Sequence, residues 1–333
     1  MTPPRSGDPT DTARIDTSRI DTARIDTARI DTARIDTAPI DALCIGESMI
    51  LVAPVRPEPL EHAGEFSLQV GGAESTVALY LAERGHRTAW LSRVGDDALG
   101  RRMVASVGGQ GVDTSGVRIV GSAPTGVYFK DPGPTGTGVL YYRAGSAASG
   151  MDPTDLDDVD WERLRLVHVS GITAALSPGC RDLLDVAFTL AGRHGVPVSF
   201  DVNHRPGLWS AETAAPVLAG FARRADLVFV GRDEAETLWG TGEPAALAEL
   251  LGPAGRLIVK DGAVGATEVA PDTGTTFVPA RQVDVVEVVG AGDAFAAGYL
   301  SGLLRGDDVE RRLRAGHDLA ARALSSTHDF LPV

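Results

Sequence analysis

A glycine-rich turn that runs directly into a helix is the segment of this sequence best suited to chemistry. It spans residues 286–298 and reads VEVVGAGDAFAAG. Phe295, Tyr299 and Leu303 follow at four-residue intervals, so they share one face of a helix that we expect to begin at about Asp293. Amide N–H groups at such a helix N-terminus, approached through small residues, can cradle a phosphate. A carboxylate there can accept a proton from an attacking hydroxyl group.

The spacing alone leaves two roles open for Asp293. Aspartate often caps the N-terminus of a helix, so a purely structural role competes with the catalytic one. The segment lacks the Lys-Ser/Thr pair of a Walker A loop, which excludes that kind of phosphate site.

Three polar segments follow short apolar runs and could complete such a site. They are residues 201–205, 231–234 and 260–262. The apolar runs before them predict strands at 196–202, 227–230 and 256–259. Helical patterns between these strands predict helices at 211–224 and 233–239. Strand–helix alternation predicts an α/β fold with a mostly parallel sheet. Ligands of such sheets lie beyond the carboxyl ends of the strands, where all three segments would meet.

The remaining chain supports the same fold class. Further strands are expected at 42–45, 88–94 and 166–169, and further helices at 76–84 and 181–195. Residues 125–143 combine two β-rich runs around a Gly/Pro loop, which predicts a hairpin in a small accessory sheet.

Composition narrows the classes of protein. The 333 residues carry a formal charge of −14, with 43% apolar and 23% charged residues, as in a globular protein of one large or two modest domains. The acidity argues against nucleic-acid binding, and an acidic substrate would need a local arginine cluster. No apolar run is long enough to span a membrane, and no signal peptide is recognisable. The two cysteines, Cys44 and Cys180, have no metal-binding spacing, which predicts a reducing, cytoplasmic location.

Residues 11–40 repeat a DTARI-like pentapeptide. A five-residue period matches neither a helix nor a strand, so it builds no continuous apolar face. We therefore expect residues 1–40 to be a disordered N-terminal tail and residues 41–333 to be the folded domain. A tether and a fluctuating helix are the alternatives.

Two segments in the expected order resemble the signatures of the ribokinase-like (PfkB) family of sugar kinases. GAGDAFAAG, at residues 290–298, is similar to the C-terminal signature, and GGAESTVA, at 71–78, is similar to the N-terminal one. SRVGDDALG, at 92–100, is a further phrase typical of the family, and the resemblance runs from about residue 42 to 325. It implies a Rossmann-type three-layer core with a small β-sheet lid, whose strands would lie within about 54–70 and 120–143. Lids of this family often pair, which implies a homo-oligomer.

Within the family, the chain resembles the 2-keto-3-deoxygluconate kinases. The residues that carry this likeness, besides GGAES, are YFK at 128–130, YYRAGSAAS at 141–149 and DVNHRPGLW at 201–209. The resemblance implies ATP-dependent phosphorylation, with Mg²⁺, of the terminal C6 hydroxyl of a sugar acid. Arg143 and Arg205 would pair with the substrate carboxylate, although ordinary surface arginines are the alternative. Tyr128 and Tyr141 would contact the polyol, although half-buried strand tyrosines would look the same.

The resemblance also assigns roles residue by residue. Asp293 would be the base, and the amides of Gly290, Ala291 and Gly292 would form the anion hole. Glu234 would organise Mg²⁺ indirectly, through water. The other nucleotide-binding residues would be Lys260, Gly262, Gly265 and His317. The other sugar-binding residues would be Gly71, Gly72, Thr76 and Asn203.

Four positions depart from the family pattern. Thr76 and Gly231 each stand where the family usually has asparagine, and His317 also replaces a more usual asparagine. Glu287 replaces the usual aspartate near the monovalent-cation (K⁺) site that the family often has. These departures leave two alternatives open: a ketose kinase of the fructokinase or ribokinase type, and a non-catalytic sugar-acid-binding pseudokinase.

Overall fold

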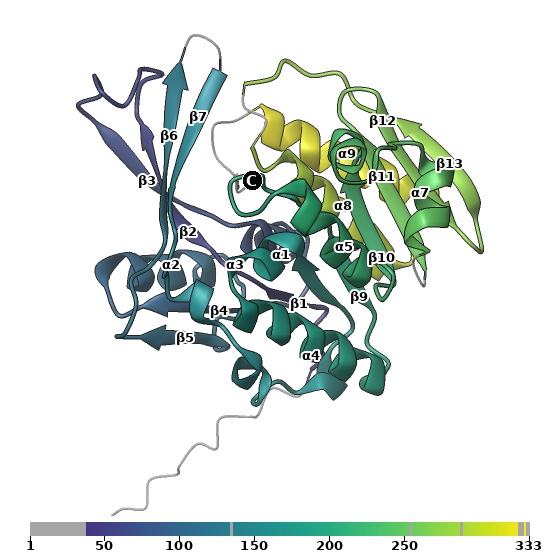
Figure 1. Ribbon diagram of the computed structural model, residues 1–333, viewed down its shortest axis with the longest axis horizontal. Coiled ribbons are helices and arrows are strands. Elements are labelled where there is room, and N and C mark those ends of the chain that lie inside the picture. The colour runs from purple at the N-terminus through teal and green to yellow at the C-terminus, as the bar shows by residue number, and fades with distance from the viewer. Residues whose placement is uncertain (1–37, 134–135, 253–254, 287–288, 326–329, 331–333) are drawn as a thin grey trace, which may run out of the picture. The chain divides into compact units, whose positions relative to one another are not determined.

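The computed structural model describes residues 38–133, 136–252, 255–286, 289–325 and 330 (Figure 1). The pentapeptide repeat up to residue 37 and the departure at Glu287 lie outside these residues, so both stay predictions. The boundary expected at residue 41 is too late, because residues 38–40 already contact the folded domain. The carbonyl of Ala38 accepts a hydrogen bond of 2.8 Å from Arg163, and Ile40 forms a β-bridge with Leu164.

A nine-stranded sheet forms the centre of the domain, in the order β13-β12-β11-β10-β9-β8-β1-β4-β5. Its parallel strands are β1 (Ala42–Ile45), β4 (Thr88–Gly95), β5 (Val117–Val120), β8 (Val167–Ser170), β9 (Val198–Asp201), β10 (Leu227–Gly231) and β11 (Arg256–Asp261). β12 (Gly265–Ala270) and β13 (Gly274–Pro279) continue the sheet antiparallel. The strands expected from the apolar runs are all confirmed, and the mostly parallel sheet is confirmed with them.

Helices cover both faces of this sheet, which makes three layers (Figure 1). They are α1 (Ala73–Glu83), α2 (Ala98–Gly108), α3 (Gly171–Leu176), α4 (Pro178–His194), α5 (Ala211–Ala222), α6 (Arg232–Trp239), α7 (Pro244–Leu251), α8 (Ala291–Arg305) and α9 (Val309–Leu324). Side chains of α4 to α7 pack in one apolar cluster, and those of α1, α2, α8 and α9 pack in another. Neighbouring residues such as Val228 and Phe229 belong to opposite clusters, because successive strand residues point to opposite faces.

A second sheet of four strands, in the order β3-β2-β6-β7, stands beside the core. Its strands are β2 (Met49–Pro54), β3 (Phe66–Gly71), β6 (Val127–Gly133) and β7 (Gly136–Tyr142). The hairpin expected at 125–143 is confirmed as β6 and β7. The lid range 54–70 misses most of β2, whose apolar run begins at Met49, with only three residues between it and the end of β1. The other range, 120–143, begins at the last residue of β5 (Val117–Val120), which lies on the edge of the large sheet.

Within the described ranges, no helix is both long enough and apolar enough to cross a membrane.

Candidate active site

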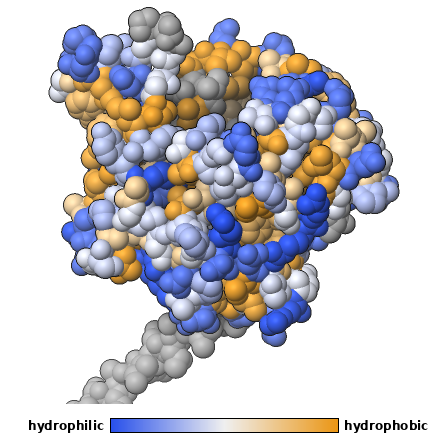
Figure 2. All heavy atoms as spheres, in the orientation of Figure 1, coloured by the Kyte–Doolittle hydropathy of each residue, from blue (hydrophilic) through white to orange (hydrophobic). Residues whose placement is uncertain are grey.

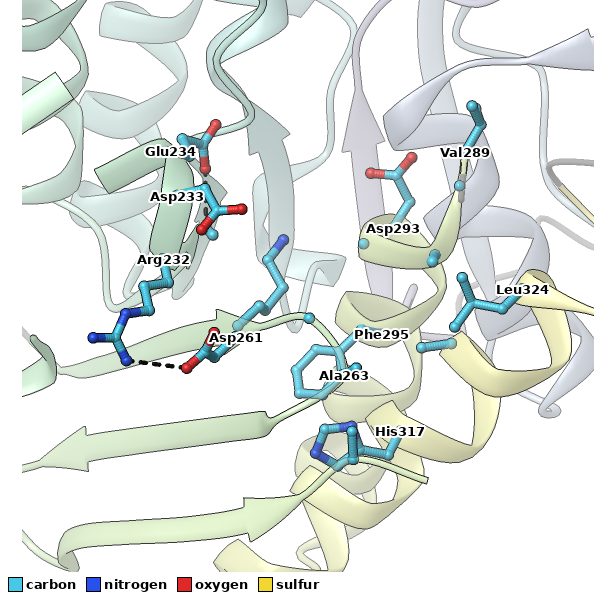
Figure 3. A pocket seen from close by; sticks show the side chains of 18 of the residues that line it. Arg232, Asp233, Glu234, Asp261, Ala263, Val289, Asp293, Phe295, His317 and Leu324 are labelled. Atoms are coloured by element: carbon cyan, nitrogen blue, oxygen red, sulfur yellow. Dashed lines mark hydrogen bonds and ion pairs between the residues drawn. The ribbon is translucent and has the colours of Figure 1, made fainter. Parts of the chain in front are cut away.

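A pocket of about 740 Å³ lies beyond the carboxyl ends of β9, β10 and β11, against the first turn of α8. It brings together twelve of the residues that the sequence analysis singled out: Tyr141, Asn203, Arg205, Glu234, Lys260, Gly262, Gly265, Gly290, Ala291, Gly292, Asp293 and His317. Figure 3 shows Asp293 and Glu234 on opposite sides of this pocket, with Phe295 and His317 further along its wall. The rule that ligand sites form beyond parallel strands therefore located the pocket correctly.

The backbone at Gly290 shapes the entrance to α8. Gly290 has a φ of 81°, in the left-handed region that glycine adopts without strain, and the helix begins at Ala291. The start is two residues earlier than the expected Asp293, so Asp293 lies within the first turn. Since the first amides of a helix have no partner within it, those of Ala291 and Gly292 are suited to receive negative charge from the pocket.

The carboxyl group of Asp293 has an environment that suits a base. The Asn203 side-chain amide donates a hydrogen bond of 3.3 Å to its Oδ1. Burial and the charge of Asp201 raise the pKa of Asp293 to about 7, while Arg205 and Lys260 act in the opposite direction. Asn203 itself has a φ of 43°, which asparagine tolerates better than most residues. A pKa near neutrality is what an efficient general base requires.

Asp201 is a site residue that the sequence analysis placed at a strand end without assigning it a role. Its Oδ2 accepts a hydrogen bond of 2.7 Å from Lys260 Nζ, although β10 lies between their strands β9 and β11. Burial disfavours the ammonium, but the surrounding carboxylates outweigh it, so the pKa of Lys260 is raised. A side chain at Gly292 would place its Cβ 3.4 Å from Lys260 Nζ, so the ammonium lies beside the first turn of α8.

Glu234 holds the backbone of two site segments together. Its carboxylate accepts hydrogen bonds from the backbone N–H of Gly231, at 3.0 Å, and from that of His204. Burial and the nearby Asp201 raise the pKa of Glu234. The signal for this role was its position in the first turn of α6, where a glutamate can bond back to the N-cap backbone.

The residues present fit a hydrated Mg²⁺ ion. Asp201 Oδ1 is buried and has no hydrogen-bond partner among the described residues, and Glu234 lines the same pocket. Carboxylate oxygens and water are the ligands that Mg²⁺ prefers. Over the same residues, no group of three or more His, Cys, Asp or Glu side chains is arranged to hold a metal. The indirect contact through water expected for Glu234 stays a prediction.

Phe295 and His317 line another wall of the pocket. The His317 ring packs edge-on against Phe295 at 5.1 Å between centroids, and its Nε2 lies 3.0 Å from the carbonyl oxygen of Val278. Burial lowers the pKa of His317, which favours the neutral ring. Gly316 permits this packing, because an added Cβ would lie 2.8 Å from the Phe295 ring. The departure at residue 317 therefore keeps a planar group at this wall.

Five predicted sugar-site residues lie outside the pocket lining: Gly71, Gly72, Thr76, Tyr128 and Arg143. They cluster where the small sheet joins the core. Tyr128 is buried and stacks on Tyr141, with ring centroids 5.7 Å apart, so Tyr141 faces the pocket and Tyr128 supports it. The Arg143 guanidinium forms an ion pair with the buried carboxylate of Glu47. Arg143 thus has a protein partner that the sequence analysis did not foresee, and its contact with substrate stays a prediction.

Comparison with known proteins assigns the fold and the family. The family model "pfkB family carbohydrate kinase" matches residues 40–330, and the chain therefore belongs to this family. A relative named 2-dehydro-3-deoxygluconokinase, from Thermoproteus tenax, is 35% identical over 84% of this chain and 86% of its own. Another, named 2-dehydro-3-deoxygalactonokinase and found in Haloferax volcanii, is 34% identical over 83% of this chain and 88% of its own.

Solved structures agree with the arrangement of the two sheets. A PfkB protein from Polaromonas sp. JS666 has a TM-score of 0.80 and 35% identity, covering 86% of this chain and 96% of its own. A structure described as a ribokinase II in complex with ATP and Mg²⁺, from E. coli, has a TM-score of 0.80 and 21% identity, covering 87% and 94%. This chain therefore has the ribokinase-like three-layer fold with a small second sheet.

Proposed function

We propose that this protein is an ATP-dependent kinase that phosphorylates the C6 hydroxyl of 2-keto-3-deoxygluconate or a close sugar acid. The observation that carries the proposal is the position of Asp293 in the first turn of α8, inside a pocket that also holds Arg205. The relatives named for kinases of 2-dehydro-3-deoxy sugar acids support the substrate class. They favour neither the ketose-kinase nor the pseudokinase alternative.

The residues of the pocket can perform the transfer as follows. Asp293, when deprotonated, takes the proton of the substrate hydroxyl, whose oxygen bonds to the terminal phosphorus of ATP as the bond to ADP breaks. The amides of Gly290, Ala291 and Gly292 hold the negative charge of the phosphoryl group in transfer. Mg²⁺, when bound, neutralises charge on the ATP phosphates. Glu234 keeps the surrounding backbone in place for that ion, and Lys260 adds a positive charge beside the first turn of α8.

The remaining contacts divide between the two substrates. Gly262, Gly265 and His317 form the nucleotide side, where the glycines leave room for close approach and His317 offers a planar surface. Arg205 and Asn203 form the sugar side together with Tyr141, whose exposed ring reaches the pocket from the small sheet. Gly71, Gly72 and Thr76, with Tyr128 and Arg143, would reach the sugar only if the small sheet closed over it, as a lid that excludes water.

Three further parts of the proposal concern the cation, the assembly and the location. A K⁺ site would involve Glu287, three residues before Gly290 in the sequence. A homodimer is supported by exposed apolar side chains on one face of the small sheet, among them Phe66, Leu68, Leu140 and Tyr142. Figure 2 shows hydrophobic residues gathered over this part of the molecule, at the upper left.

A cytoplasmic location is supported by Cys44 and Cys180, which are both buried free thiols.

The proposed activity can be tested by ADP release with ATP and Mg²⁺ over four sugars: 2-keto-3-deoxygluconate, 2-keto-3-deoxygalactonate, fructose and ribose. We expect turnover on one or both keto-deoxy acids. Turnover on fructose or ribose alone would replace the substrate class but keep the kinase. Sugar-acid binding without any turnover would favour the pseudokinase. Comparison of the two acids decides the configuration at C4, for which the two relatives give opposite indications at nearly equal identity.

A further inference from the structure

A fully buried carboxylate, that of Glu268, stands within the antiparallel end of the large sheet. Its side chain is 0% exposed, and the register of β12 pairs Glu268 with Ile258 of β11 and Thr276 of β13. A charged side chain in such a position is costly unless other groups compensate it. Glu268 is not among the residues that line the pocket, so none of the roles proposed above uses it.

Long side chains from three other elements converge on this carboxylate. Arg256 Nη1, at the start of β11, donates a hydrogen bond of 2.7 Å to Oε1. Arg312 Nη2, from α9, donates to both oxygens, at 2.8 and 3.1 Å. The Tyr299 hydroxyl group, from α8, donates a hydrogen bond of 2.7 Å to Oε2. Thr273 Oγ1, in the turn after β12, adds a hydrogen bond of 3.3 Å to Oε1. One carboxylate therefore joins β11, β12, α8 and α9.

The joined elements are those that carry the nucleotide side of the proposed site. Lys260 lies near the end of β11, and Gly262 lies in the turn that connects β11 to β12. The first turn of α8 carries Asp293 and the amides of the proposed anion hole, and α9 carries His317. The partners of Glu268 named above all belong to these elements, so the cluster lies at the common base of the nucleotide side.

Two aromatic rings connect the cluster to the pocket. The Tyr299 ring packs edge-on against that of Phe229 on β10, with centroids 5.3 Å apart, and both side chains are fully buried. Lys260 Nζ lies 5.9 Å from the centroid of the Phe229 ring and donates its hydrogen bond to Asp201. Close-packed interiors transmit displacements. A shift of Tyr299 would therefore reach Lys260 through Phe229.

Stability alone does not account for a cluster of this kind. Burial of an ion pair is costly, and apolar side chains of similar volume often stabilise a folded chain equally well or better. A carboxylate bonded at both oxygens supplies direction in addition, because its donors fit in one arrangement. Burial raises the pKa of Tyr299, so its hydroxyl group stays protonated and remains a donor to Glu268.

We propose that Glu268 is a positioning residue for the nucleotide side of the site. By holding β11, α8 and α9 at one point, it fixes Lys260 relative to the first turn of α8, so that both meet the same phosphoryl group. This inference rests on the proposed kinase activity, which it deepens by separating the alignment of ATP from the recognition of the sugar.

The test replaces the cluster with apolar side chains of similar size, in the triple variant Glu268→Met/Arg312→Met/Tyr299→Phe. This variant leaves no unpaired charge in the core, because Arg256 retains its ion pair with Asp272 at the surface. The readouts are kcat, the KM values for ATP and for the sugar, and the melting temperature. The Kd for ADP with Mg²⁺, measured without sugar, reports on the nucleotide side alone.

We expect the triple variant to melt near the wild-type temperature but to use ATP poorly. The KM for ATP and the Kd for ADP should each rise about tenfold and kcat should fall about tenfold, because small misplacements of aligned groups are costly. The KM for the sugar should stay at its wild-type value. Glu310→Met/Arg314→Met, which removes an exposed ion pair of α9, is the matched control and should change none of these values.

Two single variants grade the effect. Tyr299→Phe removes one hydrogen bond but keeps the ring on Phe229, so its loss should be smaller than that of the triple variant. Arg256→Met removes only the hydrogen bond from β11, and Arg312 still compensates the charge of Glu268. This variant therefore tests the proposal even where the triple variant does not fold, and we expect it to raise the KM for ATP about threefold.

Two results would overturn the proposal. One is a wild-type kcat, KM for ATP and Kd for ADP in the triple variant or, where that does not fold, in Arg256→Met, because the cluster would then only stabilise the fold. The other is an equal rise of the KM values for ATP and for the sugar, because the effect would then not be confined to the nucleotide side. Failure of the proposed function would instead appear in the wild-type protein, as ADP binding without phosphorylation of any sugar.

Discussion

The large sheet and the small sheet differ in what their strands bury. In the large sheet, β1, β8 and β9 are buried along their whole length, and polar side chains such as Asp201 and Lys260 line the pocket from the carboxyl ends of the strands. In the small sheet, one face carries Tyr128 and Tyr141, and the other exposes residues such as Leu140. Under the proposed function, the phosphoryl chemistry would rest on the buried large sheet, whereas part of the sugar contacts would come from the half-exposed small sheet.

Loss of Asp293, the proposed base beside the large sheet, should have the largest effect on activity. Asp293→Asn keeps the shape of the side chain but removes its ability to take a proton. We expect kcat to fall about 10³-fold, with KM values and the melting temperature little changed. Steady-state kinetics and circular dichroism measure this, with Asp185→Asn, in an exposed ion pair with Arg224, as the control. A kcat within tenfold of the wild type would show that another group is the base.

Removal of the arginine that faces the pocket should come next. Arg205→Met retains much of the side-chain volume without the charge. We expect KM for the sugar acid to rise about 10- to 100-fold, because a charge-assisted pair with the carboxylate is lost. Arg314→Met, from an exposed ion pair on α9, is the matched control. An unchanged KM would remove Arg205 from carboxylate recognition and return that role to Arg143.

The charged groups around Asp293 should determine how kcat/KM depends on pH. The pKa of Asp293 is raised to about 7, and only the deprotonated form can act as the base. We therefore expect kcat/KM to fall about tenfold per pH unit below this value and to level off above it. Since the charge of Asp201 contributes to raising the pKa of Asp293, Asp201→Asn should move the midpoint to lower pH. A profile that is flat from about pH 5.5 to about pH 8.5 would contradict the assignment.

The exposed face of the small sheet gives a prediction about assembly. Leu140 is 47% exposed on β7, and a carboxylate there would have to be buried if two lids pair. We expect Leu140→Glu to weaken a dimer by about tenfold or more, measured by sedimentation at several protein concentrations. Leu250→Glu, at an exposed leucine on α7, is the control and should leave assembly unchanged. Equal behaviour of the two variants would place the interface elsewhere.

Sequence reasoning succeeded where short-range patterns determine structure. The apolar runs predict the strands, and the glycine turn before Phe295 predicts α8, because both patterns reflect local backbone geometry. The pairing of Asp201 with Lys260 could not be predicted, since it depends on the order of strands in the sheet. The pairing of Glu47 with Arg143 joins residues far apart in the chain, and neither has a local pattern that points to the other. Sequence patterns therefore predicted which residues line the pocket better than they predicted the partners of those residues.

Removal of the N-terminal repeats, within residues 2–37, should have the smallest effect of these changes. Within its repeats, Asp and Arg nearly cancel, and the five-residue period gives no face that could pack on either sheet. Removal of residues 2–37 leaves the hydrogen bond between Arg163 and the Ala38 carbonyl in place. We expect kcat, KM and the melting temperature to stay at their wild-type values, measured by kinetics and thermal denaturation side by side. Removal of residues 2–40 is the informative comparison, because it also deletes the β-bridge of Ile40 with Leu164 and should lower the melting temperature. A fall in activity with the shorter deletion would show that the repeats act on the site, and function could then no longer be assigned to the two sheets alone.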